Sequence, residues 1–165
     1  MSTDHIDTIV EQWARERPDI DTTGMAIVGR LRRLDRVIQE RIDAVFTSHG
    51  LEGWEFDVLA TLRRHGRPHQ LTPGALLDSM MITSGAMTNR IDRLEGRGLV
   101  ERLPHPDDGR QVLVALTPAG RDLVDAAVVD HAANQLDLVA SLTERQRVQL
   151  TELLRKLDRG ISDAS

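Results

Sequence analysis

The segment from residue 83 to residue 116 restricts the possible folds more than any other part of the chain. Its first part, TSGAMTNRIDRLEGRG at residues 83–98, predicts a short helix that ends at glycine. Residues 99–103 and 111–116 are rich in leucine and valine, which favours strands, and residues 105–110 supply the proline, aspartates and glycine of a turn. A short helix followed directly by a two-stranded hairpin predicts a winged helix-turn-helix, which binds duplex DNA.

The remainder of the chain is predicted to be mostly helical. Aromatic residues make up only 2% of the chain and hydrophobic residues 40%, so aliphatic side chains must fill the core, which favours packed helices. Further helices are expected at 54–65, after Pro73, at 118–142 and at 143–161. The helix expected at 23–49 carries an apolar stripe at steps of three and four residues, made of Ile27, Leu31, Leu34, Ile38, Ile42, Val45 and Phe46.

The long helices at both chain ends carry apolar stripes that one small winged domain cannot cover, which predicts an obligate homodimer. The predicted fold class is mainly α: a winged helix-turn-helix with a two- to three-stranded antiparallel wing and long terminal dimerisation helices. The sequence is accordingly divided into three regions. Residues 1–49 form N-terminal helices for dimerisation and the ligand pocket, residues 50–117 form the DNA-binding domain, and residues 118–165 form C-terminal dimerisation helices.

The short predicted helix has the two faces that a DNA-reading helix requires. Successive helix residues turn by about 100°, which directs Met87, Ile91 and Leu94 toward the core. On the other side, small residues let the helix enter the major groove, where Asn89 can bond adenine and Arg93 can reach guanine or phosphate. An ordinary amphipathic helix shows the same pattern, but the hairpin that follows favours DNA binding. The predicted DNA-binding residues here are Ser84, Gly85, Ala86, Thr88, Asn89 and Arg93.

The turn of the predicted wing adds two further DNA-binding candidates. Arg110 lies at the tip and is placed to enter a minor groove. Asp108, two residues earlier, can hold it in position. The alternative is a solvated pair of turn charges without a partner.

The overall charge argues against DNA binding. The chain has a net charge of −5, and residues 52–110 contain 8 arginines and 9 acidic residues. We therefore expect a modest number of phosphate contacts and an affinity that falls steeply as salt rises. The alternative from another class is a winged-helix protein-interaction scaffold without specific DNA binding, which would not distinguish an operator from random DNA.

Several classes of function find no support in the sequence. The absence of cysteine excludes disulfides, thiolate metal sites and cysteine redox switches. No apolar run reaches the roughly 18 residues that span a bilayer, and no signal peptide is recognised, so a cytoplasmic protein without membrane contact is expected. His65 and His69 are interrupted by Gly66 and Pro68 and are not expected to bind metal. No catalytic arrangement is found, so neither an enzyme nor a cofactor is expected.

Five motifs together resemble the MarR (multiple antibiotic resistance regulator) family. They are LTP at 71–73, SGAMTNR at 84–90, GLVER at 98–102, PDDGR at 106–110 and VALTPAG at 114–120. The resemblance covers essentially the whole chain and implies a homodimeric repressor that binds a palindromic operator in double-stranded DNA. It also implies that a small ligand or an oxidant acting between the domains lowers the DNA affinity. Because the oxidant-sensing branch uses cysteine, a ligand is the expected signal here.

Two charged residues stand in apolar surroundings and suggest a ligand site. Arg90 lies beside the buried face of the predicted recognition helix, and Asp57 lies within a mostly apolar helix, so the cost of burying a charge predicts an ion pair between them. Arg102 could join this pair. With Trp13 in an added N-terminal helix, the set is similar to the urate-responsive branch of the family. The resemblance implies that Trp13, Asp57, Arg90 and Arg102 bind the effector, either urate or another aromatic anion; the alternative is a cluster that serves stability only.

The chemistry of these side chains suits a planar anion and suggests a switch. Arginines can neutralise it, Trp13 can stack on it, and a carboxylate can accept a ring N–H. An anion beside Asp57 would compete for Arg90. Because Arg90 belongs to the recognition helix, this competition is expected to shift that helix relative to the same helix of the second copy in the dimer. The expected coupling free energy between ligand binding and DNA binding is roughly 1–3 kcal/mol.

Overall fold

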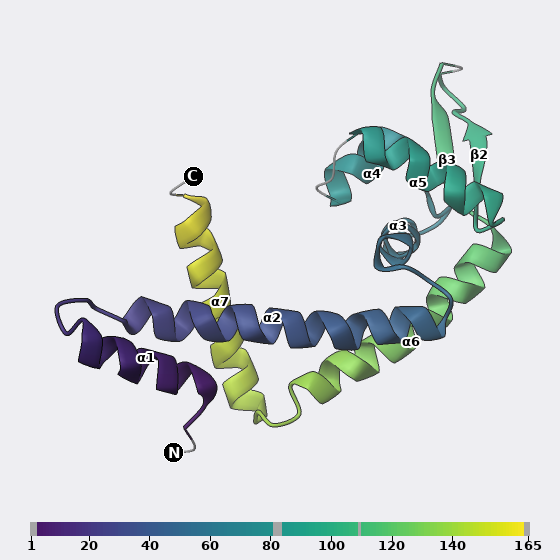
Figure 1. Cartoon of the computed structure of the whole chain (residues 1–165). Helices are drawn as coiled ribbons and strands as arrows, with labels where there is room; N and C mark the ends of the chain where they lie inside the picture. Colours follow the sequence, from purple (N-terminus) through teal and green to yellow (C-terminus); the bar gives the residue numbers. More distant parts are fainter. Residues whose placement is uncertain (1–2, 81–83, 109, 164–165) are drawn as a thin grey trace. The chain divides into compact units, whose positions relative to one another are not determined.

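The computed structural model describes residues 3–80, 84–108 and 110–163, with the side chains of 84–86 outside the described part (Figure 1). The chain forms two compact units, Met1–Ala44 and Val45–Ser165. Each unit is considered by itself below. The predicted functional regions 1–49, 50–117 and 118–165 are a separate division and stay a prediction.

The first unit is a helical hairpin made of α1 (His5–Glu16) and the first part of α2 (Thr23–Ser48). Asp4 caps α1 and accepts a hydrogen bond from the Asp7 backbone at 2.9 Å. Arg30 of α2 donates to Asp4 at 2.9 Å and to Asp7 at 2.5 Å. The buried Ile6 side chain lies against Gly29, where an added Cβ would meet it at 3.3 Å. Charge pairing and close packing thus join the two helices.

The second unit is the winged domain with two further helices. Its elements after the end of α2 are α3 (Gly53–Arg64), β1 (Gln70–Leu71), α4 (Pro73–Met80), α5 (Ser84–Gly96), β2 (Val100–Pro104), β3 (Val112–Leu116), α6 (Pro118–Leu138) and α7 (Glu144–Ser162). The strands form one antiparallel sheet in the order β1-β3-β2, with Val114 opposite both Leu71 and Arg102. This confirms the predicted fold class. The third strand, which the prediction allowed for without locating it, is β1, whose two residues are too few to show periodicity.

The core of the winged domain lies around α3. Phe46 at the end of α2 stacks on Phe56 of α3 with ring centroids 4.2 Å apart. Aliphatic side chains from α4, α5, the sheet and α6 complete this core, as the low aromatic content predicts. Among the described residues, the largest apolar side chains that are almost fully buried are Val58, Leu59, Leu62, Leu76, Met87, Ile91, Leu94, Val100, Val114 and Val124.

Hydrogen bonds join the end of α5, just before the β2–β3 hairpin, to the start of α6, just after it. Gly98 has a φ of +69° and ends α5 in the left-handed conformation that glycine adopts readily. The Thr117 hydroxyl donates to the Gly98 carbonyl at 2.7 Å and accepts from the Gly120 backbone at 3.0 Å, capping α6. Gly120 lies so close to Leu99 that an added Cβ would stand 1.9 Å from the Leu99 carbonyl oxygen. The start of α6 therefore sets where the wing begins.

α6 ends at Leu138, earlier than the predicted boundary at residue 142. Residues 139–142 instead form tight turns, in which Ala140 donates to Asp137 at 3.1 Å and Leu142 to Val139 at 3.1 Å. The side chain of Arg147 on α7 donates to the carbonyls of Val139 and Leu142 at 3.2 and 3.1 Å. These bonds satisfy carbonyl groups that the end of a helix leaves free.

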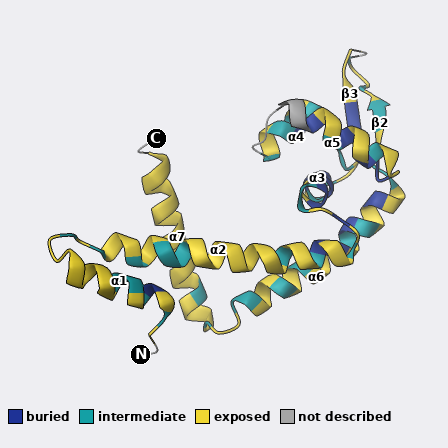
Figure 2. Ribbon diagram, viewed as in Figure 1, coloured by how far each residue is buried: buried dark blue, intermediate teal, exposed yellow. Residues whose placement is uncertain are grey.

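Most of α2 and α7 is exposed, as the yellow ribbon in Figure 2 shows, and the exposed residues include large apolar side chains. α7 has no buried residue, and its exposed apolar side chains include Leu150, Leu153, Leu154, Leu157 and Ile161. On α2 the exposed set includes Ile27, Val28, Leu34, Val37 and Ile38. Within the described residues, no helix combines the length and apolar content that crossing a bilayer would require.

Candidate nucleic-acid interface and effector site

The recognition helix α5 divides into a buried and an exposed face as predicted. Met87, Ile91 and Leu94 are at most 1% exposed. Thr88 and Asn89 are exposed. Ser84, Gly85 and Ala86 belong to the helix, but their side chains lie outside the described part of the chain. The described residues thus present polar side chains to solvent from the side of α5 that does not contact the core.

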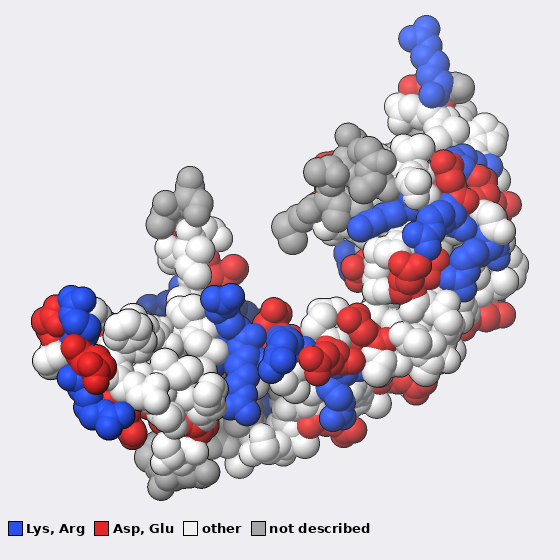
Figure 3. Space-filling view, viewed as in Figure 1, with Lys and Arg blue, Asp and Glu red and all other residues white. Residues whose placement is uncertain are grey.

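The two strands of the wing pair in regular antiparallel register, and Asp108 accepts hydrogen bonds between them. Asp108 accepts from the Arg110 backbone N–H at 3.0 Å and from the Gln111 side chain at 2.9 Å. These hydrogen bonds hold the pKa of Asp108 below its usual value, the Arg110 backbone bond contributing most. Asp108 therefore orders the turn through the backbone of Arg110, and the exposed Arg110 side chain belongs to the tip, where basic atoms stand out in Figure 3.

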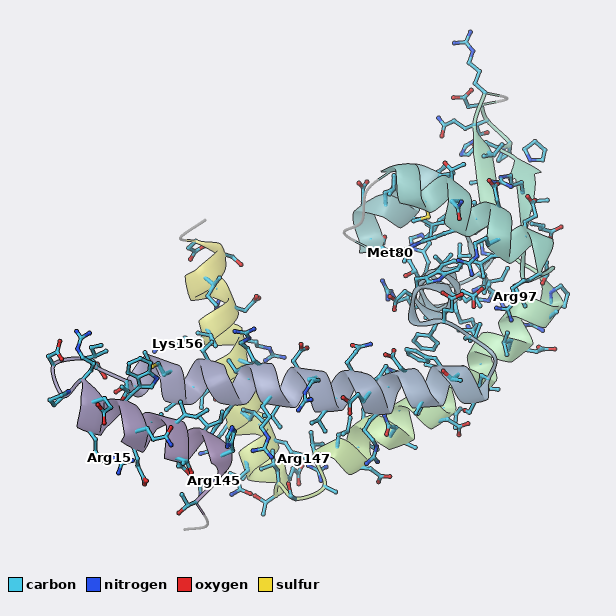
Figure 4. The ribbon with its side chains drawn as sticks, viewed as in Figure 1. Arg15, Met80, Arg97, Arg145, Arg147 and Lys156 are labelled. Carbon is cyan, nitrogen blue, oxygen red and sulfur yellow. The ribbon has the colours of Figure 1, made fainter. Side chains whose placement is uncertain are left out.

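The C-terminal half of α5 is tied to the start of α3. Arg93 donates to Glu52 at 2.6 Å, and both side chains are about half exposed. Arg97, labelled in Figure 4, donates to Glu55 at 2.6 Å and to the Gly50 carbonyl at 2.9 Å. Sequence reasoning missed Glu55, which is only 2% exposed. Its position three residues after Glu52, at the start of an apolar helix, is the signal of a helix N-terminus that could have found it.

Glu55 is satisfied by two donors although it is buried. Its carboxylate accepts from the Glu52 backbone N–H at 2.9 Å as well as from Arg97. A buried charge with such partners persists because each hydrogen bond offsets part of the loss of hydration. Glu55 thus caps α3 and fastens α5 at the same time.

Asp57 and Arg90 do not form the predicted direct ion pair. No nitrogen–oxygen contact within 4.0 Å joins them among the ion pairs of the described residues. The guanidinium of Arg90 instead lies over the Trp54 ring, 5.5 Å from its centroid. Neighbouring atoms desolvate the Asp57 carboxylate and raise its pKa. The positive charges of Arg90, Arg64 and His131 oppose that rise, so Arg90 still acts on Asp57 through its charge.

A polar cavity of about 210 Å³ adjoins Asp57. Pockets for drug-sized ligands usually start at roughly 300 Å³, so this volume suits a small ligand. Asp57 is exposed in the single chain, although nearby atoms partly desolvate its carboxylate. Arg64, a second cation beside Asp57, was not recognised in the sequence. The lining residues are Asp57, Thr61, Arg64, Ser79 and Met80.

The remaining two predicted effector residues, Arg102 and Trp13, belong to the second and the first unit respectively. Arg102 of β2 donates to Asp92 at 2.5 Å and also pairs with Glu95, both on α5. These carboxylates keep the pKa of Arg102 above its usual value, with the Asp92 hydrogen bond as the main cause. Trp13 belongs to α1 of the first unit and is 43% exposed. Within the second unit, the charge of Arg90 opposes the rise in the Asp57 pKa without a direct ion pair, and Arg102 is engaged with α5.

His131 on α6 lies against the aromatic pair of the core. Its ring centroid is 5.0 Å from Phe46 and 5.1 Å from Phe56, and its Nε2 contacts the Gln135 side chain at 2.9 Å. Desolvation lowers the pKa of His131, although the charge of Asp57 opposes this shift. Among the residues that the structure describes, no three His, Asp or Glu side chains are grouped to hold a metal ion.

Comparison with known proteins agrees with this geometry. A model described as MarR family matches residues 49–111. The chain is 36% identical over 156 residues to the HTH-type transcriptional regulator PecS of Dickeya dadantii, covering 94% of each protein.

Two solved structures extend the likeness to three dimensions. A mutant of MarR from E. coli complexed with operator DNA matches with a TM-score of 0.69 and 26% identity, covering 88% of this chain and 96% of that one. BpsR of Bordetella bronchiseptica, described with regulation of its DNA binding by 6-hydroxynicotinic acid, matches with a TM-score of 0.68 and 28% identity, covering 80% and 92%. With its recognition helix, wing and buried core in this arrangement, the chain belongs to the MarR family of winged-helix DNA-binding transcriptional regulators.

Proposed function

We propose that this protein is a cytoplasmic, homodimeric repressor without catalytic activity, which a small aromatic anion such as urate releases from a palindromic operator. The observation that carries the proposal is that α5 bears both an exposed polar face suited to DNA and an arginine next to the candidate effector cavity. Thr88 and Asn89 form an exposed polar face, and Arg90, one residue further, is electrostatically coupled to Asp57 beside a cavity.

In the proposed DNA complex, α5 enters the major groove. Asn89 can bond an adenine through two groups, the Thr88 hydroxyl can bond a base or phosphate, and Arg93 can bond a guanine or phosphate. The small side chains of Ser84, Gly85 and Ala86 would allow close approach of the helix. Arg110 would enter the minor groove from the wing, with Asp108 holding the turn. Residues 50–117 thus form the proposed DNA-binding region.

The proposed regions 1–49 and 118–165 hold the two copies together. Their exposed apolar side chains on α2 and α7 need a partner surface, because burying apolar area is favourable. A symmetric dimer presents two recognition helices, which suits half-sites about one helical turn apart.

The proposed effector binds where Asp57 and Arg90 interact. Arg90 and Arg64 supply positive charge near the cavity, which favours an anion. Desolvation raises the pKa of Asp57, and its carboxylate can accept a hydrogen bond from a ring N–H of the ligand. Arg102 can take part only by exchanging its bonds to Asp92 and Glu95 for bonds to the anion. Trp13 would stack on the ligand from α1.

The test is binding to a labelled duplex that carries the inverted repeat upstream of the protein's own gene, measured by fluorescence anisotropy against a scrambled duplex. We expect at least tenfold preference for the repeat, loss of that preference in Asn89→Ala, and release by urate. Equal affinity for both duplexes would favour an interaction scaffold and overturn the proposal. Operator binding that millimolar urate leaves unchanged would keep the repressor and reject urate.

The effector residues need a separate comparison. We expect Asp57→Asn and Arg90→Gln to weaken urate release at least tenfold while operator binding is retained. Thr8→Ala, on the exposed surface of α1, serves as the unaffected control. If both variants respond to urate like the unmodified protein, the effector site lies elsewhere.

A further inference from the structure

The first turn of α3 carries an aromatic side chain that contacts two arginines of the recognition helix. Trp54 donates its indole N–H to the Glu52 carboxylate at 2.7 Å, and Glu52 accepts from Arg93 at 2.6 Å through its other oxygen. The Arg93 guanidinium lies 4.7 Å from the centroid of the Trp54 ring, and the Arg90 guanidinium lies 5.5 Å from it. Trp54, Glu52, Arg90 and Arg93 form one contact group, called the Trp54 clamp below.

The two arginines reach the same ring because they stand three residues apart on α5. Side chains at this spacing lie on one side of a helix. A guanidinium within about 6 Å of an indole centroid is attracted to the ring. Because the guanidinium carbons lie 5.5 and 4.7 Å from one centroid, they are at most about 10 Å apart, the Debye length at 0.1 M ionic strength, and repel each other. Neutralising the charge of one arginine is therefore expected to change how closely the other is held to the ring.

The two arginines have different proposed tasks. Arg90 is electrostatically coupled to Asp57, beside the cavity, whereas Arg93 is a predicted DNA contact. When an anion neutralises Arg90, the repulsion across the ring falls, and Glu52 and Trp54 hold Arg93 more strongly. An Arg93 held in this way is less available to a base or a phosphate.

We propose that Trp54, with Glu52, is the positioning residue that transmits effector binding at Arg90 to the DNA contact at Arg93. This inference rests on the proposed function and adds to it a defined route through one side chain. The interaction needs no change in the buried face of α5, because Met87, Ile91 and Leu94 remain in the core. Trp54 itself is not required to touch effector or DNA.

The measurement is the coupling ratio, defined as the operator Kd with saturating urate divided by the Kd without urate. We expect a ratio above ten for the unmodified protein and a ratio within twofold of one for Trp54→Leu, which still binds the operator. Trp54→Phe keeps a ring but loses the indole N–H, so it should give an intermediate ratio. Circular dichroism checks that each variant is folded.

A second variant avoids any change in packing. Glu52 is about half exposed, so Glu52→Gln preserves the fold but removes the charge that holds Arg93. We expect its coupling ratio to fall at least threefold. Glu101→Gln, on the exposed side of β2, is the matched control and should keep the full ratio.

A spectroscopic readout separates positioning from general stability. The chain has two tryptophans, so 5-fluorotryptophan labelling gives two fluorine resonances, and Trp54→Phe assigns them. We expect urate to shift the Trp54 resonance in the unmodified protein and to shift it much less in Arg90→Gln. A Trp54 resonance that does not move while urate releases DNA would contradict the inference.

The two levels of the hypothesis fail differently. If the unmodified protein binds the operator and ignores urate, the proposed effector and the inference are both wrong. If urate acts on the unmodified protein and equally on Trp54→Leu and Glu52→Gln, the proposed function stands and the Trp54 clamp does not transmit the signal.

Discussion

Individual charged residues in this protein have distinct roles according to their burial. Glu55 is almost fully buried and joins two helices, whereas Arg17 and Asp19 form an ion pair with both side chains more than half exposed. Exposed pairs contribute little because water screens them, while a buried carboxylate that loses its donor keeps the whole cost of lost hydration. Two ion pairs of similar length, 2.6 and 2.7 Å, are therefore expected to respond differently to mutation.

Arg97→Ala should destabilise the fold by roughly 1.5–3 kcal/mol, the range for hydrogen bonds to charged groups, because Glu55 would keep only one of its two donors. The free energy of unfolding is measured by urea denaturation at pH 7.5. Arg17→Ala serves as the control and should change it by less than about 1 kcal/mol. Equal effects of the two substitutions would show that burial of Glu55 does not matter.

The free energy of unfolding should depend on pH in part because His131 titrates at a lower pH in the folded chain than in the unfolded chain. Its pKa lies below the ordinary value of 6.5 in the folded chain because its ring is desolvated against two phenylalanines. The unfolded chain therefore binds a proton more readily, and folding stability should decrease as the pH falls from 6.5 through the lower folded pKa. The raised pKa of Asp57 acts in the opposite direction, above its ordinary value of 3.8.

Comparison with His131→Phe isolates this contribution. The variant cannot titrate at position 131, so its unfolding free energy should fall less between pH 7.5 and pH 5.5. His5→Gln, on the exposed start of α1, should retain the pH dependence of the unmodified chain. Identical pH profiles for His131→Phe and the unmodified protein would exclude His131 as the cause.

At the scale of elements, α5 is fastened on two sides. Arg93 of α5, and Arg97 directly after its end, pair with carboxylates at the start of α3. Arg102 of β2 pairs with Asp92 and Glu95 of α5. The recognition helix and the wing are therefore positioned relative to each other by side chains as well as by the short connection at Gly98. This arrangement fixes the proposed major-groove contact of α5 and the proposed minor-groove contact of the wing relative to each other.

The junction of wing and α6 depends on the absence of a side chain at Gly120. Gly120→Ala would place a Cβ 1.9 Å from the Leu99 carbonyl oxygen, so we expect a loss of about 1–3 kcal/mol or more, as overpacking produces. Gly96→Ala is the control, because nothing lies within 4 Å of its added Cβ and its φ is not positive. That change should stabilise by about 0.4–1 kcal/mol in thermal or urea unfolding.

The wing should contribute to DNA affinity through one exposed arginine. Arg110→Ala should weaken operator binding and make the slope of log K against log salt less steep by about 1, as expected when one positive charge near the phosphates that flank the minor groove is lost. Anisotropy titrations over a salt series measure this slope. Arg159→Ala on α7 is a control with the same change of charge, and an equal loss in both variants would remove the wing from the interface.

At the scale of the whole molecule, the exposed apolar side chains of α7 require a partner. Leu153 is 65% exposed, so Leu153→Glu costs little within one chain but should prevent association. We expect sedimentation velocity to show a monomer and operator binding to be lost. Val148→Glu introduces the same charge on the opposite side of the helix and should leave the dimer intact. A Leu153→Glu protein that remains dimeric would place the dimer contact elsewhere.

The sequence by itself determined the winged architecture and the buried face of α5. Both follow from local rules, because the strand, turn and helix patterns lie within a few residues of each other. Met87, Ile91 and Leu94 were correctly placed by helical spacing alone. The outer end of α6 was predicted less well, since Arg147 on the next helix satisfies the carbonyls where α6 ends.

Only the tertiary structure decided which charges meet. Asp57 and Arg90 were expected to pair directly, yet Arg90 lies over Trp54, and Arg102 is engaged by Asp92 and Glu95. Glu55 and Arg97 were not expected to pair at all, although they are joined at 2.6 Å. Helical periodicity shows which side of one helix is apolar, but a charge takes its partner according to how separate helices pack. That packing depends on contacts between residues far apart in the chain, which no local pattern encodes.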